Sequence, residues 1–268
     1  MGIADQIAGD WHAALAALAW QVDLGVDEVI GDAPLDRYDL PEPIKTAPAT
    51  ARPQNAPPSP APAEVAVDAV AAARAAAGRA QNLESLRAAL GSFDLCELKK
   101  GARNTVFADG NPGARVLVLG EAPGRDEDME GRPFVGRAGQ LLDRMFATIG
   151  LSRSSPDTQS ALYITNVMPW RPPGNRDPEP AEVAMMRPFV ERHIALVDPD
   201  VIVVMGNTPL FALTGQKGIM RARGSWTKAL DRPLLPMVHP AYLLRNPIAK
   251  REAWADLLSL QAQLRVKA

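Results

Sequence analysis

The sequence predicts an α/β protein built on a central, mostly parallel sheet of four strands with helices on both faces. Two observations indicate this fold. Four short runs of β-branched and aliphatic residues follow one another from residue 116 onward, and runs with helical spacing separate them. Short apolar strands that alternate with helices are typical of a parallel sheet covered on both sides. An N-terminal helix and a disordered linker are expected before this domain.

The first 81 residues divide into three segments by composition. At 10–29 apolar residues recur at helical spacing, which predicts an amphipathic helix within an N-terminal segment 1–32. Residues 33–63 contain nine prolines among Ala, Ser and Thr, and this composition predicts an extended, disordered linker. An alanine-rich helix is expected at about 63–77, within a segment 64–81.

The folded domain is expected at 82–268. A short helix should begin after Asn82, a suitable N-cap, and end before Gly91. The predicted strands are 116–120, 162–167, 201–206 and 235–239. The predicted helices between and after them are about 136–149, 179–197, 207–214 and 249–265.

Composition and charge narrow the class of protein. No apolar run in the 268 residues reaches the roughly 18 that a membrane span needs, and the acidic N-terminus does not resemble a signal peptide. We therefore expect a cytoplasmic protein without membrane contact.

The single cysteine, Cys96, excludes an intrachain disulfide and a four-thiolate metal site. Residues 1–89 hold 6 Lys/Arg and 12 Asp/Glu, whereas 90–268 hold 23 and 19, so the second part suits a polyanion better.

Polar side chains follow each predicted strand. Glu121 follows the first, Asn166 lies in the second, Asn207 follows the third, and His239 ends the fourth. The carboxyl ends of parallel strands meet at one edge of a sheet, where ligands bind in open α/β folds. The sequence therefore predicts a site that combines a carboxylate, two amides and an imidazole.

Each of these groups has a functional and a structural interpretation. His239 can donate a hydrogen bond to an oxygen that gains negative charge, or it can be a core histidine. Asn166 can match a donor–acceptor edge such as N3–H and O4 of uracil, or it can simply end a strand. Phe134 can stack on a flat ring, or it can form a small apolar cluster with its neighbours. Most acidic residues of the 126–130 run suit a solvated helix start, but Glu121 points toward the predicted site.

Two later segments suit contact with a nucleic-acid backbone. The run GIMRARGSW offers cations at Arg221 and Arg223, although it can equally be an ordinary basic loop. The run HPAYLLRNP combines an apolar tip with a cation, although it can also be a helix start with core leucines. An apolar tip can wedge into a duplex and stabilise a flipped nucleotide. The residues expected to contact DNA are Arg221, Arg223, Tyr242, Leu243, Leu244 and Arg245.

Three motifs carry a resemblance to a known family. These are GEAPGRDED-x-x-GRPFVG-x-AGQLLDRM, YITNV-x-x-WRPPGNR-x-P and HPAYLLRNP, in this order from about residue 95 to 258. They resemble uracil-DNA glycosylases, in particular the subfamily often called family four, whose members usually carry an iron–sulfur cluster. The resemblance implies the fold of uracil-DNA glycosylases and an activity that releases uracil from DNA by hydrolysis.

The resemblance also implies roles for individual residues. The strand exit formed by Glu121, Ala122, Pro123 and Gly124 would border the uracil, Phe134 would stack on it, Asn166 would read its edge, and His239 would bond its O2. Glu127 would lie near C5 and help exclude the methyl group of thymine. Relatives with a catalytic Asp in the first loop have it where this chain has Ala122, so Glu121 and backbone groups would hold the attacking water.

The resemblance breaks at the cluster ligands. The four cysteine positions correspond to Phe93, Cys96, Trp170 and Met186, so three thiolates are replaced by large apolar side chains. We expect a fold without the cluster, or any other metal or cofactor, in which these side chains stabilise the corner by burial.

The sequence thus predicts a monomeric DNA-repair glycosylase that flips uracil out of DNA and leaves an abasic site. A protein partner is expected for the N-terminal helix. Two alternatives stay open: a catalytically silent relative that binds uracil-containing or abasic DNA, and a metabolite-binding α/β protein. An exposed apolar wedge would argue against the second.

Overall fold

The computed structural model describes residues 12, 15 and 68–266. The amphipathic helix expected at 10–29 and the linker expected at 33–63 lie outside the described residues, apart from His12 and Leu15. Within 68–266, the α-helices are α3 Ala69–Arg79, α4 Leu83–Gly91, α5 Leu98–Gly101, α6 Arg125–Glu130, α7 Arg137–Ala147, α8 Pro180–Val197, α9 Asn207–Thr214, α10 Ile219–Ala222, α11 Pro240–Arg245 and α12 Lys250–Val266.

The strands form one mixed sheet. They are β1 Ala108–Gly110, β2 Val116–Gly120, β3 Leu162–Asn166, β4 Val201–Met205, β5 Thr227–Ala229 and β6 Arg232–Met237, in the order β1-β3-β2-β4-β6-β5. The four central strands are parallel, as the sequence predicts. The expected number of four is wrong, because β1 and β5 add an antiparallel strand at each edge. Each has only three residues, too few for a period-two pattern to be recognised.

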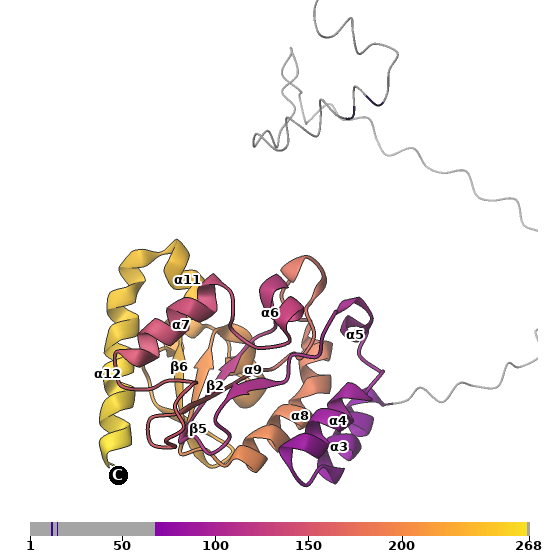
Figure 1. The fold of residues 1–268 in the computed structure, drawn as a ribbon, viewed down its shortest axis with the longest axis horizontal. Coiled ribbons are helices and arrows are strands. Elements are labelled where there is room, and N and C mark those ends of the chain that lie inside the picture. The colour runs from indigo at the N-terminus through magenta and orange to yellow at the C-terminus, as the bar shows by residue number, and fades with distance from the viewer. Residues whose placement is uncertain (1–11, 13–14, 16–67, 267–268) are drawn as a thin grey trace, which may run out of the picture. The chain divides into compact units, whose positions relative to one another are not determined.

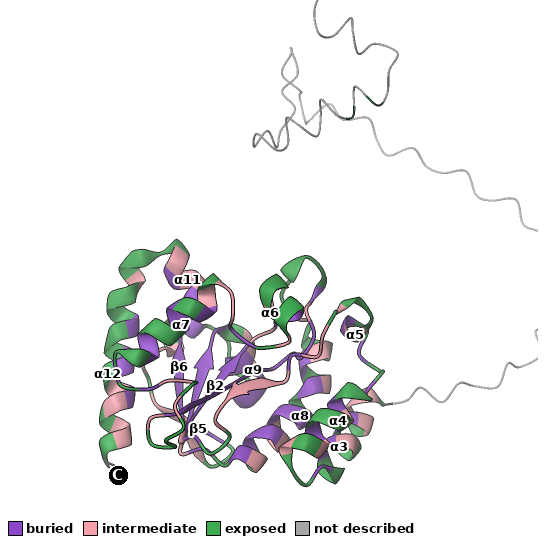
Figure 2. Cartoon of the chain, viewed as in Figure 1, coloured by how far each residue is buried: buried purple, intermediate pink, exposed green. Residues whose placement is uncertain are grey.

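Helices cover both faces of the sheet (Figure 1). Alternate side chains of β2, β3 and β4 enter two different cores. Leu117 and Leu119 of β2 pack in a core with α3, α4, α8 and α9. Val116 and Val118 pack in a second core with α7, α11 and α12. The strands β2, β3 and β4 are therefore buried throughout (Figure 2). Burial on both faces explains why they are continuous apolar runs in the sequence.

The alanine-rich helix begins later than expected and belongs to the folded domain. Asp68 caps α3 by accepting from the backbone N–H groups of Val70 and Ala71. Ala73 and Ala77 are buried in the core that also contains α8, and Arg192 of α8 donates to the Ala80 carbonyl at 2.6 and 2.8 Å. The expected boundary at 82 would remove this packed helix, so a truncation that keeps the fold should retain Asp68.

Two 3₁₀ turns and several loops complete the described region. The turns are η1 Pro173–Asn175 and η2 Pro247–Ala249. No helix among the described residues is long and apolar enough to cross a membrane.

Candidate active site

A cavity of about 690 Å³ lies where the parallel strands end. Eleven of the residues singled out in the sequence line it: Glu121, Ala122, Pro123, Gly124, Glu127, Phe134, Asn166, Asn207, His239, Tyr242 and Arg245. They come from the ends of β2, β3, β4 and β6 and from the segments that follow. The topology therefore brings together most of the residues that the sequence predicts at one edge of the sheet.

Asn166 and Phe134 meet above Gly120, the last residue of β2. A Cβ atom on Gly120 would lie 2.3 Å from Oδ1 of Asn166 and 2.4 Å from Cε2 of Phe134, so no larger residue fits there. Asn166 is only 8% exposed, and its Oδ1 has no hydrogen-bond partner. A buried acceptor without a partner carries a free-energy cost that a ligand donor can relieve.

His239 is held as a neutral hydrogen-bond donor. It caps α11, and its Nδ1 accepts from the backbone N–H of Ala241 at 3.2 Å. Burial lowers the pKa of His239 to about 4, and the charge of Arg245 acts in the same direction. The ring is therefore neutral at pH 7 with its proton on Nε2. Phe134 stacks on this ring at a centroid distance of 5.4 Å.

Glu121 is fixed by a residue that the sequence did not single out. Its Oε2 accepts a hydrogen bond of 2.6 Å from Oγ1 of Thr208, at the start of α9. Burial raises the pKa of Glu121, the hydrogen bond from Thr208 opposes this rise, and the charge of Asp177 adds to it. Both Thr208 and Asp177 line the cavity.

Glu127 binds the loop itself. Its Oε2 accepts from the N–H of Gly124 at 3.0 Å, and its Oε1 accepts from Val135 and Gly136, both at 2.9 Å. Both carboxylate oxygens are therefore used to join the start of α6 to the segment after Phe134. This geometry favours a positioning role over the expected direct contact with the base.

The loops expected to contact DNA divide into cavity-lining and structural residues. Tyr242 and Arg245 line the cavity. Arg223 instead pairs with Asp256 and Glu252 of α12, which occupies its guanidinium. Arg221 is exposed on α10.

One residue of the expected apolar tip, Leu243, does not lie at the surface. Leu243 is 0% exposed and belongs to the core on the α12 side, and Leu244 packs against the same core. A six-residue helix buries this face of HPAYLLRNP, as the alternative interpretation held. Ile248, four residues after Leu244 in the turn η2, is an apolar side chain that is 93% exposed.

Several further residues that line the cavity had no role assigned from the sequence. They include Pro172, Asn175, Arg176, Asp177, Thr208, Ile219 and Met220. The WRPPGNR motif was visible, but no residue in it had an assigned role. Asn207, expected as a site amide, has its Oδ1 occupied by the backbone N–H groups of Gly218 and Ile219.

The four positions aligned with cluster ligands form an apolar corner. Phe93, Cys96, Trp170 and Met186 are all buried in the core beside α8, at 6% exposure or less. The indole N–H of Trp170 donates to Thr105 Oγ1 at 3.1 Å, and burial raises the pKa of the Cys96 thiol, which disfavours a thiolate. One protonated thiol among apolar side chains does not fit an iron–sulfur cluster.

The fold and the cavity define an α/β protein that can bind a flat, polar ring at the carboxyl ends of its parallel strands. The family model of the uracil DNA glycosylase superfamily matches residues 107–258. The type-4 uracil-DNA glycosylase of Thermotoga maritima is 39% identical over 171 residues, which are 63% of this chain and 86% of that protein. The type-4 enzyme of Archaeoglobus fulgidus is 35% identical over 187 residues, 66% of this chain and 90% of that protein.

This chain belongs to the uracil-DNA glycosylase superfamily. The relation to its type-4 members, which the three motifs predict, is confirmed.

Proposed function

We propose that this chain is a DNA-repair glycosylase that hydrolyses the bond between uracil and deoxyribose in DNA. The observation that carries the proposal is the buried Oδ1 of Asn166, which has no partner and lies beside Phe134 on the cavity wall. N3–H of uracil is a donor that would satisfy it, while the amide NH₂ would donate to O4. The names of the type-4 relatives support the same activity.

The proposed reaction breaks one bond and forms one. The N1–C1′ bond breaks, and its electron pair leaves with uracil as negative charge that spreads to O2. A water oxygen bonds to C1′, and Glu121 accepts a proton from that water. The neutral His239 donates its Nε2–H to O2, where the charge develops, and so stabilises the leaving anion. The groups that act in these steps are protein side chains.

The direct test is release of uracil from a labelled oligonucleotide, followed by alkaline cleavage of the abasic site. We expect release from uracil-containing DNA, undiminished by EDTA, and none from a matched thymine control. Tight binding of the uracil strand without release would instead identify a silent binder. If the protein neither releases uracil nor binds the uracil-containing strand, the proposed function is wrong.

Asn166→Asp should change which base is released. Asp lacks the NH₂ that opposes the N4 amino group of cytosine, and it supplies an acceptor for that group. We expect loss of most uracil activity and a weak release of cytosine, because a mismatched bidentate contact costs roughly 1–3 kcal/mol. Release of both bases from matched oligonucleotides measures this. An unchanged uracil preference in a folded variant would show that Asn166 does not read the base.

Two substitutions should shift the acid limb of the pH–rate profile in opposite directions. The Glu121 carboxylate faces Thr208 and Asp177, and Glu127, Arg176, His239 and Arg245 line the same cavity. A base must be deprotonated, so activity falls as the pH drops through the raised pKa of Glu121. Thr208→Val removes a bond that lowers this pKa and should move the limb to higher pH, whereas Asp177→Asn should move it to lower pH.

Single-turnover rates between pH 4 and 8 measure this shift, with Thr208→Ser as the control that keeps the hydroxyl. If both substitutions lower the rate equally at every pH, Glu121 is not the group that titrates.

For DNA binding, we propose Ile248 as the apolar wedge in place of the buried Leu243. It lies three residues after the cavity-lining Arg245. Ile248→Ala should slow excision from duplex DNA by about 10-fold and leave single-stranded substrate unaffected, because only the duplex must be unstacked. Leu258→Ala, at an exposed leucine on α12, is the control. Equal slowing on both substrates would contradict a wedge.

We infer that the chain acts as a monomer in the cytoplasm and that its N-terminal segment binds another protein. The acidic balance of residues 1–89 supports a partner other than DNA for that segment.

A further inference from the structure

The loop that carries Phe134 has a backbone conformation that needs support. Phe134 has a φ of 54°, which residues other than glycine rarely adopt. Its carbonyl group lies against α7, where a Cβ atom on Gly139 would be 1.8 Å from the carbonyl oxygen. This close approach leaves little freedom for the backbone at Phe134, and it places the carbonyl where another group can bind it.

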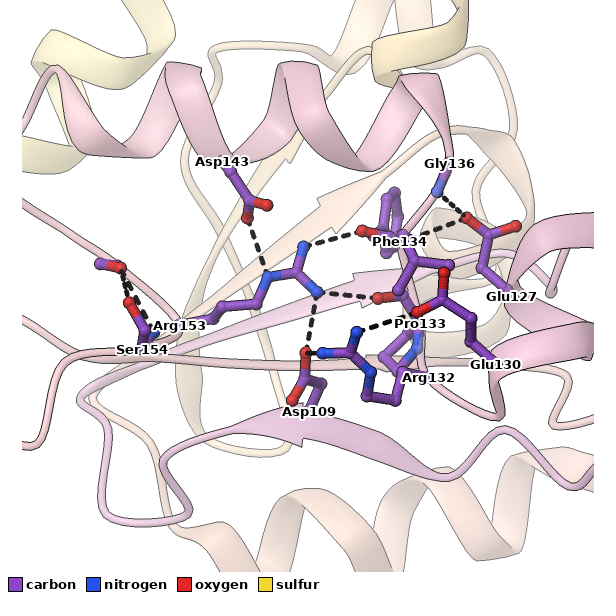
Figure 3. A network of polar contacts seen from close by, with 12 residues as sticks. Asp109, Glu127, Glu130, Arg132, Pro133, Phe134, Gly136, Asp143, Arg153 and Ser154 are labelled. Atoms are coloured by element: carbon purple, nitrogen blue, oxygen red, sulfur yellow. Dashed lines mark hydrogen bonds and ion pairs between the residues drawn. The ribbon is translucent and has the colours of Figure 1, made fainter.

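Arg153 binds this carbonyl and its neighbour (Figure 3). Its Nη2 donates to the Phe134 carbonyl at 2.9 Å, and its Nη1 donates to the Pro133 carbonyl at 2.8 Å. The same guanidinium pairs with Asp143 of α7 through Nε at 2.8 Å and with Asp109 of β1 through Nη1 at 3.0 Å. The Arg153 side chain is 13% exposed. The two carboxylates offset the cost of placing this charge in a mostly buried position.

Glu127 binds the other side of the same loop. The backbone carbonyls of Pro133 and Phe134 are bound by Arg153, and the N–H groups of Val135 and Gly136 are bound by Glu127. Four consecutive residues around the Phe134 ring are therefore anchored by two charged side chains. Both anchors bind backbone atoms, and Arg153 itself does not line the cavity, so it can set where the ring lies without touching the cavity contents.

We propose that Arg153 is a positioning residue for uracil excision, which holds the 133–134 backbone so that the Phe134 ring stays at the cavity. The inference rests on the proposed function. An arginine is needed because its planar fork can reach two carbonyls and two carboxylates at once, whereas lysine offers one compact ammonium group. Arg153 acts on the reaction only through Phe134.

A double-mutant cycle tests this dependence. Single-turnover uracil release is measured for wild type, Arg153→Met, Phe134→Ala and the double variant, each per folded molecule. We expect Arg153→Met to slow release by about 10- to 100-fold when Phe134 is present, as for a misplaced positioning group. In the Phe134→Ala background the same change should cost less than about 2-fold, because residues that act as one unit are not additive.

Arg115 provides a matched control. Its side chain is also 13% exposed, pairs with Asp200 at 2.6 Å and donates to the Leu264 carbonyl at 3.1 Å. It directly precedes β2, at the end of the sheet opposite the cavity. Arg115→Met should lower stability and leave the rate per folded molecule unchanged.

A second variant and a second measurement complete the test. If Arg153→Met does not fold, the cycle is run with Arg153→Lys, which retains the positive charge. Hydrogen exchange at Val135 and Gly136 should accelerate in the Arg153 variants and not in Arg115→Met, whether or not the protein releases uracil. If the wild-type protein releases no uracil, the proposed function is wrong, but hydrogen exchange still tests the role of Arg153. Equal slowing in both Phe134 backgrounds, or unchanged exchange, would overturn the role of Arg153.

Discussion

His239→Ala should slow uracil release by on the order of 100-fold or more, the usual loss when one donor to a developing anion is removed. The Nδ1 atom of His239 accepts from Ala241, so Nε2 carries the proton that the leaving uracil needs. Because burial lowers the pKa of His239 to about 4, the rate should show no titration of this ring between pH 5 and 8. Single-turnover kinetics with uracil-containing oligonucleotide measures both effects.

Two variants separate chemistry from stability in this test. His239→Asn can keep the cap at the start of α11 while losing the imidazole, so it should be nearly as slow as His239→Ala. His193 is a second buried histidine, and burial lowers its pKa to about 4. Its Nε2 forms a hydrogen bond with the Tyr163 hydroxyl, and neither residue lines the active-site cavity. His193→Gln should change stability but not the rate per folded molecule. A wild-type rate for His239→Ala would remove His239 from the mechanism.

Trp170→Ala should cost ~3–5 kcal/mol of the free energy of unfolding. Trp170 is 1% exposed in the apolar corner that also holds Phe93, Cys96 and Met186. The substitution creates a cavity there and leaves Thr105 without the indole donor at 3.1 Å. Denaturant unfolding measures the loss, and the melting temperature should fall by roughly 10 °C in a domain of this size.

Trp254→Ala is the control for this prediction. Trp254 is 43% exposed on α12, so its removal should change stability far less. If Trp170→Ala and Trp254→Ala cost the same, the corner does not depend on packing at Trp170. A loss near the expected value would support the view that burial stabilises the positions where relatives have cysteines.

The local pattern of residues was enough to predict the four central strands and the groups at their ends. A strand buried on both faces must be apolar along its whole length, so β2, β3 and β4 were visible as runs. Glu121, Asn166 and His239 could be assigned to one site because parallel strands end at the same edge. The motifs around them also identified the family.

Whether a given apolar or charged side chain is buried, exposed or paired was decided only by the tertiary structure. Leu243 and Ile248 are both apolar, but only packing against α7 and α12 buries the first and leaves the second exposed. Arg223 was assigned to DNA from its charge, yet Asp256, 33 residues later, occupies its guanidinium. Such partners are distant in sequence, so no local pattern can reveal them.

The residues that hold the site residues in place also depend on the tertiary structure. Thr208 reaches Glu121 across 87 residues, and Arg153 reaches Phe134 across 19 residues that include α7. A hydrogen bond of under 3 Å depends on how elements pack, and neither residue belongs to a motif that predicts it. The sequence by itself therefore determined the fold class and the chemical groups of the site. The tertiary structure decided which residues hold those groups in place, because that depends on distances between elements far apart in the chain.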